Sequence, residues 1–206
     1  WSYQVNDGQR QIAATTMTRS EAGLPDRGFV FCCFNSSYKI LPDVFAVWMR
    51  LLQQVEGSVL WLLEGSKDAV ANLRREAQAR GVAPSRLVFA PRLSLPEHLA
   101  RHRLADLFID TLPCNAHTTA SDALWAGLPV LTCTGRTFAG RVAASLLRAI
   151  GMPELVTPSL PAYEVLALQL AQSPEAMAAC KAKLAQHRDT WPLYDSTQFA
   201  RHIERA

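Results

Sequence analysis

The chain has 206 residues, of which 49% are hydrophobic and 19% charged, so it can bury a substantial core and is too apolar to be disordered. Its 21 Lys and Arg against 18 Asp and Glu give a net charge of +3, which excludes the concentrated basicity of a nucleic-acid-binding surface. The longest uncharged stretch, residues 123–135, is too short and too rich in Gly and Pro to cross a bilayer, so no membrane span is expected.

The cysteines favour a reducing compartment. They number five, which is odd, and they form no C-x-x-C pair, so neither a disulfide framework nor a zinc site is expected. We predict reduced, mostly buried thiols in an intracellular, cytoplasmic protein. Because the chain begins with Trp1, we also expect it to be one part of a longer protein.

Residues 1–27 have no sustained hydrophobic period and are interpreted as an entry segment from a preceding lobe, whereas residues 28–206 are predicted to form one regular lobe. The first half of this lobe alternates continuous apolar runs, typical of buried strands, with helical patterns that repeat apolar residues every three or four positions. In chain order we predict strand 28–34, helix 43–55, strand 58–63, helix 67–80, strand 86–90, a short helix after Ser94 and strand 105–110.

The pattern continues with helix 118–126, strand 128–133, a helix before Gly151, a short strand at 155–156, and helices at 161–172, 174–187 and 195–205. Such alternation predicts an α/β fold with a doubly wound, Rossmann-like parallel sheet, here followed by C-terminal helices. Local signals support the helix ends: capping boxes at Ser94-x-x-Glu97 and Thr119-x-x-Asp122, starts at Ser159 and Ser173, and terminal glycines at Gly81, Gly127 and Gly151.

Ligands of open parallel sheets bind beyond the carboxyl ends of the strands, so the loops that follow the strands are the candidate site. One of them, residues 111–119, leads into a predicted helix whose first residues are His117, Thr118 and Thr119. Free backbone N–H groups at such a helix start form a phosphate site. Asp122 lies one turn further on, where it can accept hydrogen bonds from a ribose. The alternative is that Thr118 or Thr119 only caps the helix and that Asp122 only complements the helix dipole.

The only cation in the loop after the first strand is Lys39, which is predicted to meet the charge of a diphosphate leaving group. Neither G-x-G-x-x-G nor G-x-x-x-x-G-K-[ST] is present, and there is no D-x-D pair, so ordinary NAD binding, P-loop chemistry and a carboxylate-held metal are not expected.

Histidines and one cysteine complete the list of candidates. His98 and Arg101 lie three residues apart on one helix face, where they either contact a base or lie in solvent. The other histidines, His102, His187 and His202, are predicted to be surface residues. Cys114 is close to His117 but lacks an identifiable third group, which disfavours it as a nucleophile.

Several segments are specific enough to compare with known families. They are Phe34-Asn-Ser-Ser-Tyr-Lys39-Ile, Ser58-Val-Leu-Trp-Leu-Leu, Glu97-His98, Leu104-Ala-Asp106 to Asp110-Thr111, Cys114-Asn-Ala-His117-Thr-Thr119, Asp122-Ala-Leu-Trp-Ala-Gly127 and Arg141-Val-Ala-Ala-Ser145. Together they resemble the C-terminal catalytic lobe of the O-GlcNAc transferase family, glycosyltransferases of the GT-B type, and especially its bacterial members. The resemblance covers roughly residues 28–200.

The resemblance implies a UDP-GlcNAc site, metal-independent transfer with inversion, and Ser or Thr acceptors in proteins or peptides. It implies catalytic roles for Lys39 and His117, with the lysine on the diphosphate. Ser36 stands where animal members have a glutamine, and Leu95 where they have a lysine. The donor-binding residues implied are Ser36, Lys39, Leu93, Leu95, His98, Arg101, Cys114, His117, Thr118, Thr119 and Asp122.

A GT-B enzyme needs two facing lobes, so the resemblance also implies an N-terminal catalytic lobe and tetratricopeptide repeats elsewhere in the parent chain. Without them, this lobe is expected to bind UDP and to transfer nothing. Two alternatives remain open at this point: a non-catalytic module that binds a sugar nucleotide, and a UDP-sugar epimerase.

Overall fold

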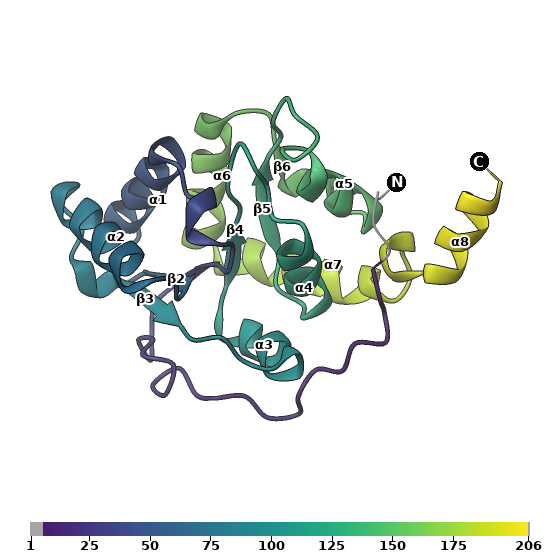
Figure 1. Ribbon diagram of the computed structural model, residues 1–206, viewed down its shortest axis with the longest axis horizontal. Helices are drawn as coiled ribbons and strands as arrows, with labels where there is room; N and C mark the ends of the chain where they lie inside the picture. The colour runs from purple at the N-terminus through teal and green to yellow at the C-terminus, as the bar shows by residue number, and fades with distance from the viewer. Residues whose placement is uncertain (1–5, 206) are drawn as a thin grey trace.

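The computed structural model describes residues 6–205, and its centre is a six-stranded sheet (Figure 1). The strand order is β3-β2-β1-β4-β5-β6, and every neighbouring pair is parallel. The predicted α/β fold and all six predicted strands are therefore confirmed. The strands are β1 (Val30–Cys33), β2 (Val59–Leu63), β3 (Leu87–Ala90), β4 (Leu107–Ile109), β5 (Val130–Cys133) and β6 (Val156–Thr157).

Helices connect the strands and cover the sheet (Figure 1). The eight α-helices of the described residues lie in the segments predicted for them, and α1 packs against α6, which also contacts α7 and β5. They are α1 (Pro42–Gln54), α2 (Lys67–Ala79), α3 (Leu95–Arg101), α4 (Thr118–Trp125), α5 (Val142–Ala149), α6 (Leu160–Gln172), α7 (Pro174–Arg188) and α8 (Ser196–Glu204). Short 3-10 turns at Ser37–Lys39, Pro84–Arg86, His102–Leu104, Pro153–Leu155 and Pro192–Tyr194 complete the lobe.

Most of the predicted helix ends are correct. Ser94 and Glu97 form their capping box, Ser159 and Ser173 cap α6 and α7, and α2, α4 and α5 are followed by glycines at positive φ. The box predicted at Thr119 and Asp122 is wrong, because α4 has His117 at its N-cap and no capping hydrogen bond from that side chain. Both side chains of the predicted box have distant partners instead: Thr119 donates to Asn35 and Asp122 accepts from Arg10.

A hydrogen-bonded chain in the core fixes α1 and α6 against the end of β4. Trp48 of α1 donates its Nε1–H to the hydroxyl of Tyr163 on α6 at 3.1 Å, and this hydroxyl donates to the backbone oxygen of Asp110, also at 3.1 Å. Both aromatic side chains are fully buried. The sheet edge that carries the candidate loops is thus anchored by satisfied polar groups inside an apolar core.

The segment before β1 crosses the surface of the lobe without forming a helix or strand over residues 6–29 (Figure 1). Ala13 donates its N–H to the oxygen of Pro96 at 3.1 Å, and Arg19 pairs with Asp106, also at 3.1 Å. Leu24 is buried in the core. The predicted boundary at residues 27 and 28 stays a prediction, and residues 1–5 lie outside the described part.

The five cysteines form no disulfide, and Cys32, Cys33 and Cys133 are buried. Over the residues that the structure covers, there is no helix with the length and apolarity needed to cross a membrane.

Candidate functional site

Asp110, the residue after β4, organises the loop at the centre of the candidate site. Its Oδ1 accepts hydrogen bonds from the backbone N–H groups of Thr111 (2.7 Å) and Ala116 (2.6 Å), and Oδ2 accepts from the hydroxyl of Thr132 (2.7 Å). The side chain of Asn35 adds a longer bond of 3.3 Å to Oδ1. Burial raises the pKa of Asp110 to about 6, despite these hydrogen bonds. The carboxylate therefore closes the loop into a tight turn ahead of α4.

The loop after β1 is joined to this turn by two contacts. Lys39 donates from Nζ to the backbone oxygen of Asn115 at 3.0 Å, and Thr119 in the first turn of α4 donates to Asn35. β1 and β4 are neighbours in the sheet at the point where the strand order reverses, so their loops meet at the switch point where open parallel sheets bind ligands. The Lys39 ammonium thus lies against the turn that leads into α4.

The start of α4 supplies a second source of positive potential. Helix geometry leaves the N–H groups of its first residues, Thr118 and Thr119, without intrahelical acceptors, and the helix dipole adds partial positive charge there. His117, at the N-cap, lies 3.3 Å through Nε2 from the oxygen of Ala139. Burial, with a smaller effect from Lys39, lowers the pKa of His117, which favours the neutral imidazole. The ammonium and the helix start form a site suited to an anion such as a diphosphate, and the neutral imidazole lies at its edge.

The loop after β5 packs directly on the same turn. Asn115 donates its N–H to the oxygen of Ala139 at 2.9 Å, and Gly135 donates to the oxygen of Gly140 at 2.6 Å. A methyl group at Gly140 would stand 2.8 Å from the oxygen of Pro113, so the two loops touch at a position that only glycine fits. The rim of the site is built by three loops that fix each other.

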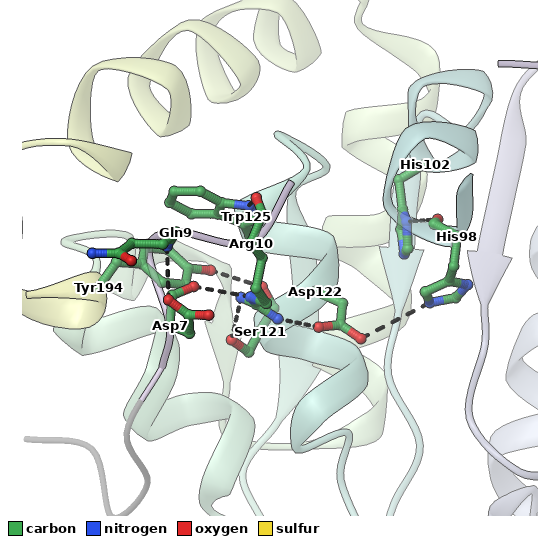
Figure 2. Close-up of polar contacts among 9 residues, drawn as sticks. All are labelled: Asp7, Gln9, Arg10, His98, His102, Ser121, Asp122, Trp125 and Tyr194. Atoms are coloured by element: carbon green, nitrogen blue, oxygen red, sulfur yellow. Dashed lines mark hydrogen bonds and ion pairs between the residues drawn. The ribbon is translucent and has the colours of Figure 1, made fainter. Parts of the chain in front are cut away.

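Asp122 projects from α4 into a cluster that includes the entry segment (Figure 2). Arg10 forms an ion pair with Asp122 Oδ1 and donates to Ser121 Oγ at 3.2 Å. Oδ2 of Asp122 lies 3.9 Å from Nε2 of His98. Burial raises the pKa of Asp122, and the nearby Arg10 offsets part of this rise. The carboxylate is held from one side and faces a histidine on the other.

His98 belongs to a buried aromatic and basic cluster below the rim. Arg101 donates to His98 Nδ1 at 2.6 Å and to the oxygen of Pro91, and its guanidinium lies 4.2 Å from the ring centre of Phe34. Burial lowers the pKa of His98 to about 4, so its ring is neutral, with the proton on Nε2. Arg101 is only 1% exposed, so the alternative that placed it in solvent is wrong.

The surface location predicted for His102 is also wrong. It is 1% exposed, bonds through Nδ1 to the oxygen of His98 at 2.8 Å, and meets the ring of Phe34 edge-on. The reason is that His102 follows His98 by four residues, so both side chains lie on the helix face that packs on Phe34. The prediction holds for His202, which is exposed, whereas His187 is half-buried and stacks on Trp191.

The remaining predicted site residues lie in the same loops. Ser36 precedes the turn that carries Lys39, Leu93 is half-buried in the loop after β3, and Leu95 is exposed at the start of α3. Cys114 is half-buried in the loop after β4, with its Sγ 3.9 Å from the oxygen of Asn115. Among the described residues, no group of three or more His, Cys, Asp or Glu is placed to hold a metal ion. A cavity of about 670 Å³ lies beside Arg101, between β3 and residues 17–23.

Three residues that matter for this geometry were not predicted as site residues. Asp110 and Asn35 belong to the segments that carry the family resemblance, and a carboxylate and an amide directly after buried strands are a recognisable signal. Arg10 gave no signal, because its partner Asp122 lies 112 residues away.

Comparison with known proteins identifies the family. The sequence profile of glycosyl transferase family 41 matches residues 4–203. The chain is 38% identical over 187 residues to the UDP-N-acetylglucosamine–peptide N-acetylglucosaminyltransferase of Caenorhabditis elegans, with 91% of this chain and 16% of that protein covered. The probable enzyme of the same name from Arabidopsis thaliana, SEC, is also 38% identical, with 91% and 19% covered. The chain thus spans less than a fifth of the length of these relatives.

Solved structures agree with this result. A mutant of the O-GlcNAc transferase from Thermobaculum terrenum has a TM-score of 0.82 and 31% identity, over 86% of this chain and 35% of that one. Anabaena HepE, solved with UDP and glucose, has a TM-score of 0.63 at 16% identity, over 91% and 51%, and shares the fold alone. With a family profile that matches nearly its whole length, the chain belongs to glycosyl transferase family 41.

Proposed function

We propose that the chain is the donor-binding lobe of an inverting UDP-GlcNAc:protein O-linked N-acetylglucosaminyltransferase that modifies Ser and Thr. The observation that carries the proposal is the joint placement of Lys39 and the start of α4 beside one turn, within a family 41 chain. Relatives at 38% identity are named for transfer of N-acetylglucosamine from the UDP sugar to peptides.

In the proposed reaction an acceptor hydroxyl attacks the anomeric carbon of the sugar and UDP leaves. Negative charge then develops on the β-phosphate, and the Lys39 ammonium and the N–H groups of Thr118 and Thr119 stabilise it. The Thr118 hydroxyl adds a further polar contact to the phosphates and the neutral His117 one to the sugar, whereas the Thr119 hydroxyl already donates to Asn35. One donor aimed at developing charge is typically worth about 10²–10³ in kcat. Metal independence, which the family resemblance implies, needs these groups to supply all the leaving-group stabilisation.

The nucleoside is proposed to lie over α3 and α4. Asp122 accepts from the ribose, His98 stacks on the uracil, and the backbone near Leu93 and Leu95 contacts the base edge. Arg101 acts beneath this layer, because its guanidinium donates to His98 Nδ1 and the oxygen of Pro91 and stacks on Phe34. Ser36, in the loop after β1, and Cys114, in the loop after β4, are proposed to complete the rim.

The proposed partners are an N-terminal catalytic lobe that covers the rim and supplies the acceptor side, and tetratricopeptide repeats that bind protein substrates. The small share of the relatives' length that this chain spans supports their presence in the parent protein. Five unpaired cysteines support an intracellular location.

The test is transfer by the full-length protein. With UDP-GlcNAc and a Ser-containing peptide we expect a β-linked product, formed equally well after chelation of divalent cations. UDP binding without any transfer would indicate a non-catalytic module. Interconversion of UDP sugars without an acceptor would indicate an epimerase, and either result would refute the transferase assignment.

A further inference from the structure

We infer that Arg10, in the segment before β1, is a positioning residue of the nucleotide site: it holds Asp122 so that Oδ2 is the oxygen that accepts a ribose hydroxyl. The inference rests on the proposed function and extends it to a residue outside the strand loops. Figure 2 shows the arrangement, with Arg10 on one side of the carboxylate and His98 on the other.

Arg10 is itself firmly held. Its Nε donates to the backbone oxygen of Asp7 at 2.9 Å, and its own backbone oxygen accepts from Nε1 of Trp125 at 3.0 Å. The guanidinium lies 5.9 Å from the ring centres of both Trp125 and Tyr194. With 12% of its side chain exposed, Arg10 reaches Asp122 in an ordered geometry that costs little further entropy.

The two oxygens of Asp122 therefore have different tasks. Oδ1 is occupied by Arg10, whereas in the described part of the chain Oδ2 accepts no hydrogen bond and has only His98 Nε2 nearby, at 3.9 Å. This distance is too long for a direct hydrogen bond between Asp122 and His98. A hydroxyl oxygen of a ligand can bridge the two groups instead. Because Arg101 donates to Nδ1, the proton of His98 is on Nε2. A ribose hydroxyl between them would donate to Asp122 and accept from His98.

Charge explains why an arginine is needed. Asp122 has only 7% of its side chain exposed, and burial favours its neutral, protonated form. The charged and titratable groups around it are Arg10, the buried and neutral Tyr194, and His98, which is also neutral. Arg10 lowers the pKa of this buried carboxyl against the effect of burial and so favours its ionised form, and an ionised acceptor binds a hydroxyl more strongly than a neutral one.

The experiment measures, in the full-length protein, the affinities for UDP and for 2′,3′-dideoxy-UDP by calorimetry. A hydrogen bond to a charged group is worth a factor of about 10 to 100 in affinity, so the wild type should prefer UDP by that factor. Arg10→Met keeps the apolar stem between Trp125 and Tyr194. Its preference for UDP over dideoxy-UDP should fall to the level measured for Asp122→Asn, and its affinity for dideoxy-UDP should equal that of the wild type. UDP binding by the variant should also weaken as the pH is lowered from neutrality, because Asp122 then takes up a proton.

Arg19→Met is the matched control. Arg19 lies in the same segment and also pairs with an aspartate, Asp106 at 3.1 Å, so its loss loosens the segment without touching Asp122. This control should keep the wild-type preference. Arg10→Lys keeps the positive charge but cannot contact Asp122 and Ser121 at the same time, so this variant should retain part of the preference for UDP.

Four results separate the possible failures. An unchanged preference in Arg10→Met would overturn the inference, and so would an equal loss for both nucleotides, which marks a purely structural role. Equal binding of both nucleotides by the wild type would remove the ribose role of Asp122 and the inference with it. No UDP binding by the wild type would refute the proposed function itself.

Discussion

Replacement of Asp110 by Asn should change how the stability of the lobe depends on pH. The carboxylate is 2% exposed, and burial raises its pKa to about 6 from an ordinary value of 3.8. A raised pKa means that the folded state binds the proton more tightly than the unfolded state. The stabilisation from this proton is therefore complete below the unfolded pKa and disappears as the pH rises through the folded pKa. About two units at 1.36 kcal/mol each amount to about 3 kcal/mol.

The Asn side chain keeps an oxygen for the N–H groups of Thr111 and Ala116 and turns an NH2 group toward Thr132, so the loop is expected to persist. Urea unfolding at a series of pH values measures the difference. Between about pH 4 and about pH 7, the wild type should lose about 2 kcal/mol relative to Asp110→Asn. Asp189→Asn removes a charge at an exposed site and serves as the control. Parallel stability curves for wild type and Asp110→Asn would refute the assigned burial cost.

Three further substitutions test other parts of the site. Lys39→Met should lower kcat by about 10² or more in a peptide glycosylation assay, with the exposed Lys183→Met unchanged; a near-normal kcat would remove Lys39 from the mechanism. His102→Phe should reduce the loss of stability at acid pH, which thermal melts at a series of pH values measure. Burial lowers the pKa of His102 to about 3, so the unfolded state takes up a proton on this histidine before the folded state does as the pH falls. Gly140→Ala places a methyl group 2.8 Å from the oxygen of Pro113, so it should destabilise the protein by about 1–3 kcal/mol and weaken UDP binding. A wild-type melting temperature would show that the loops after β4 and β5 can separate freely.

The fold was predictable because its signals are local. Buried parallel strands are continuous apolar runs, and helices repeat apolar residues at fixed short spacings, so elements such as 58–63 and 43–55 can be read from neighbouring residues alone. The positions of Lys39 and His117 at one rim also followed, because parallel strands bring their carboxyl ends to the same edge.

The tertiary structure alone decided which polar side chains of the site are buried and which partners they have. The same helix face that suggested a rim position for Arg101 points under the rim, because α3 packs against Phe34 and Trp61 at the sheet. Thr119 and Asp122 have the spacing of a capping box, but side chains from the loop after β1 and from the entry segment bind them instead. The sequence by itself determined the sheet, its loops and the family motifs. The pairing of Asp122 with Arg10 was decided by the tertiary structure, since contacts between residues 112 positions apart exist only after the chain has folded.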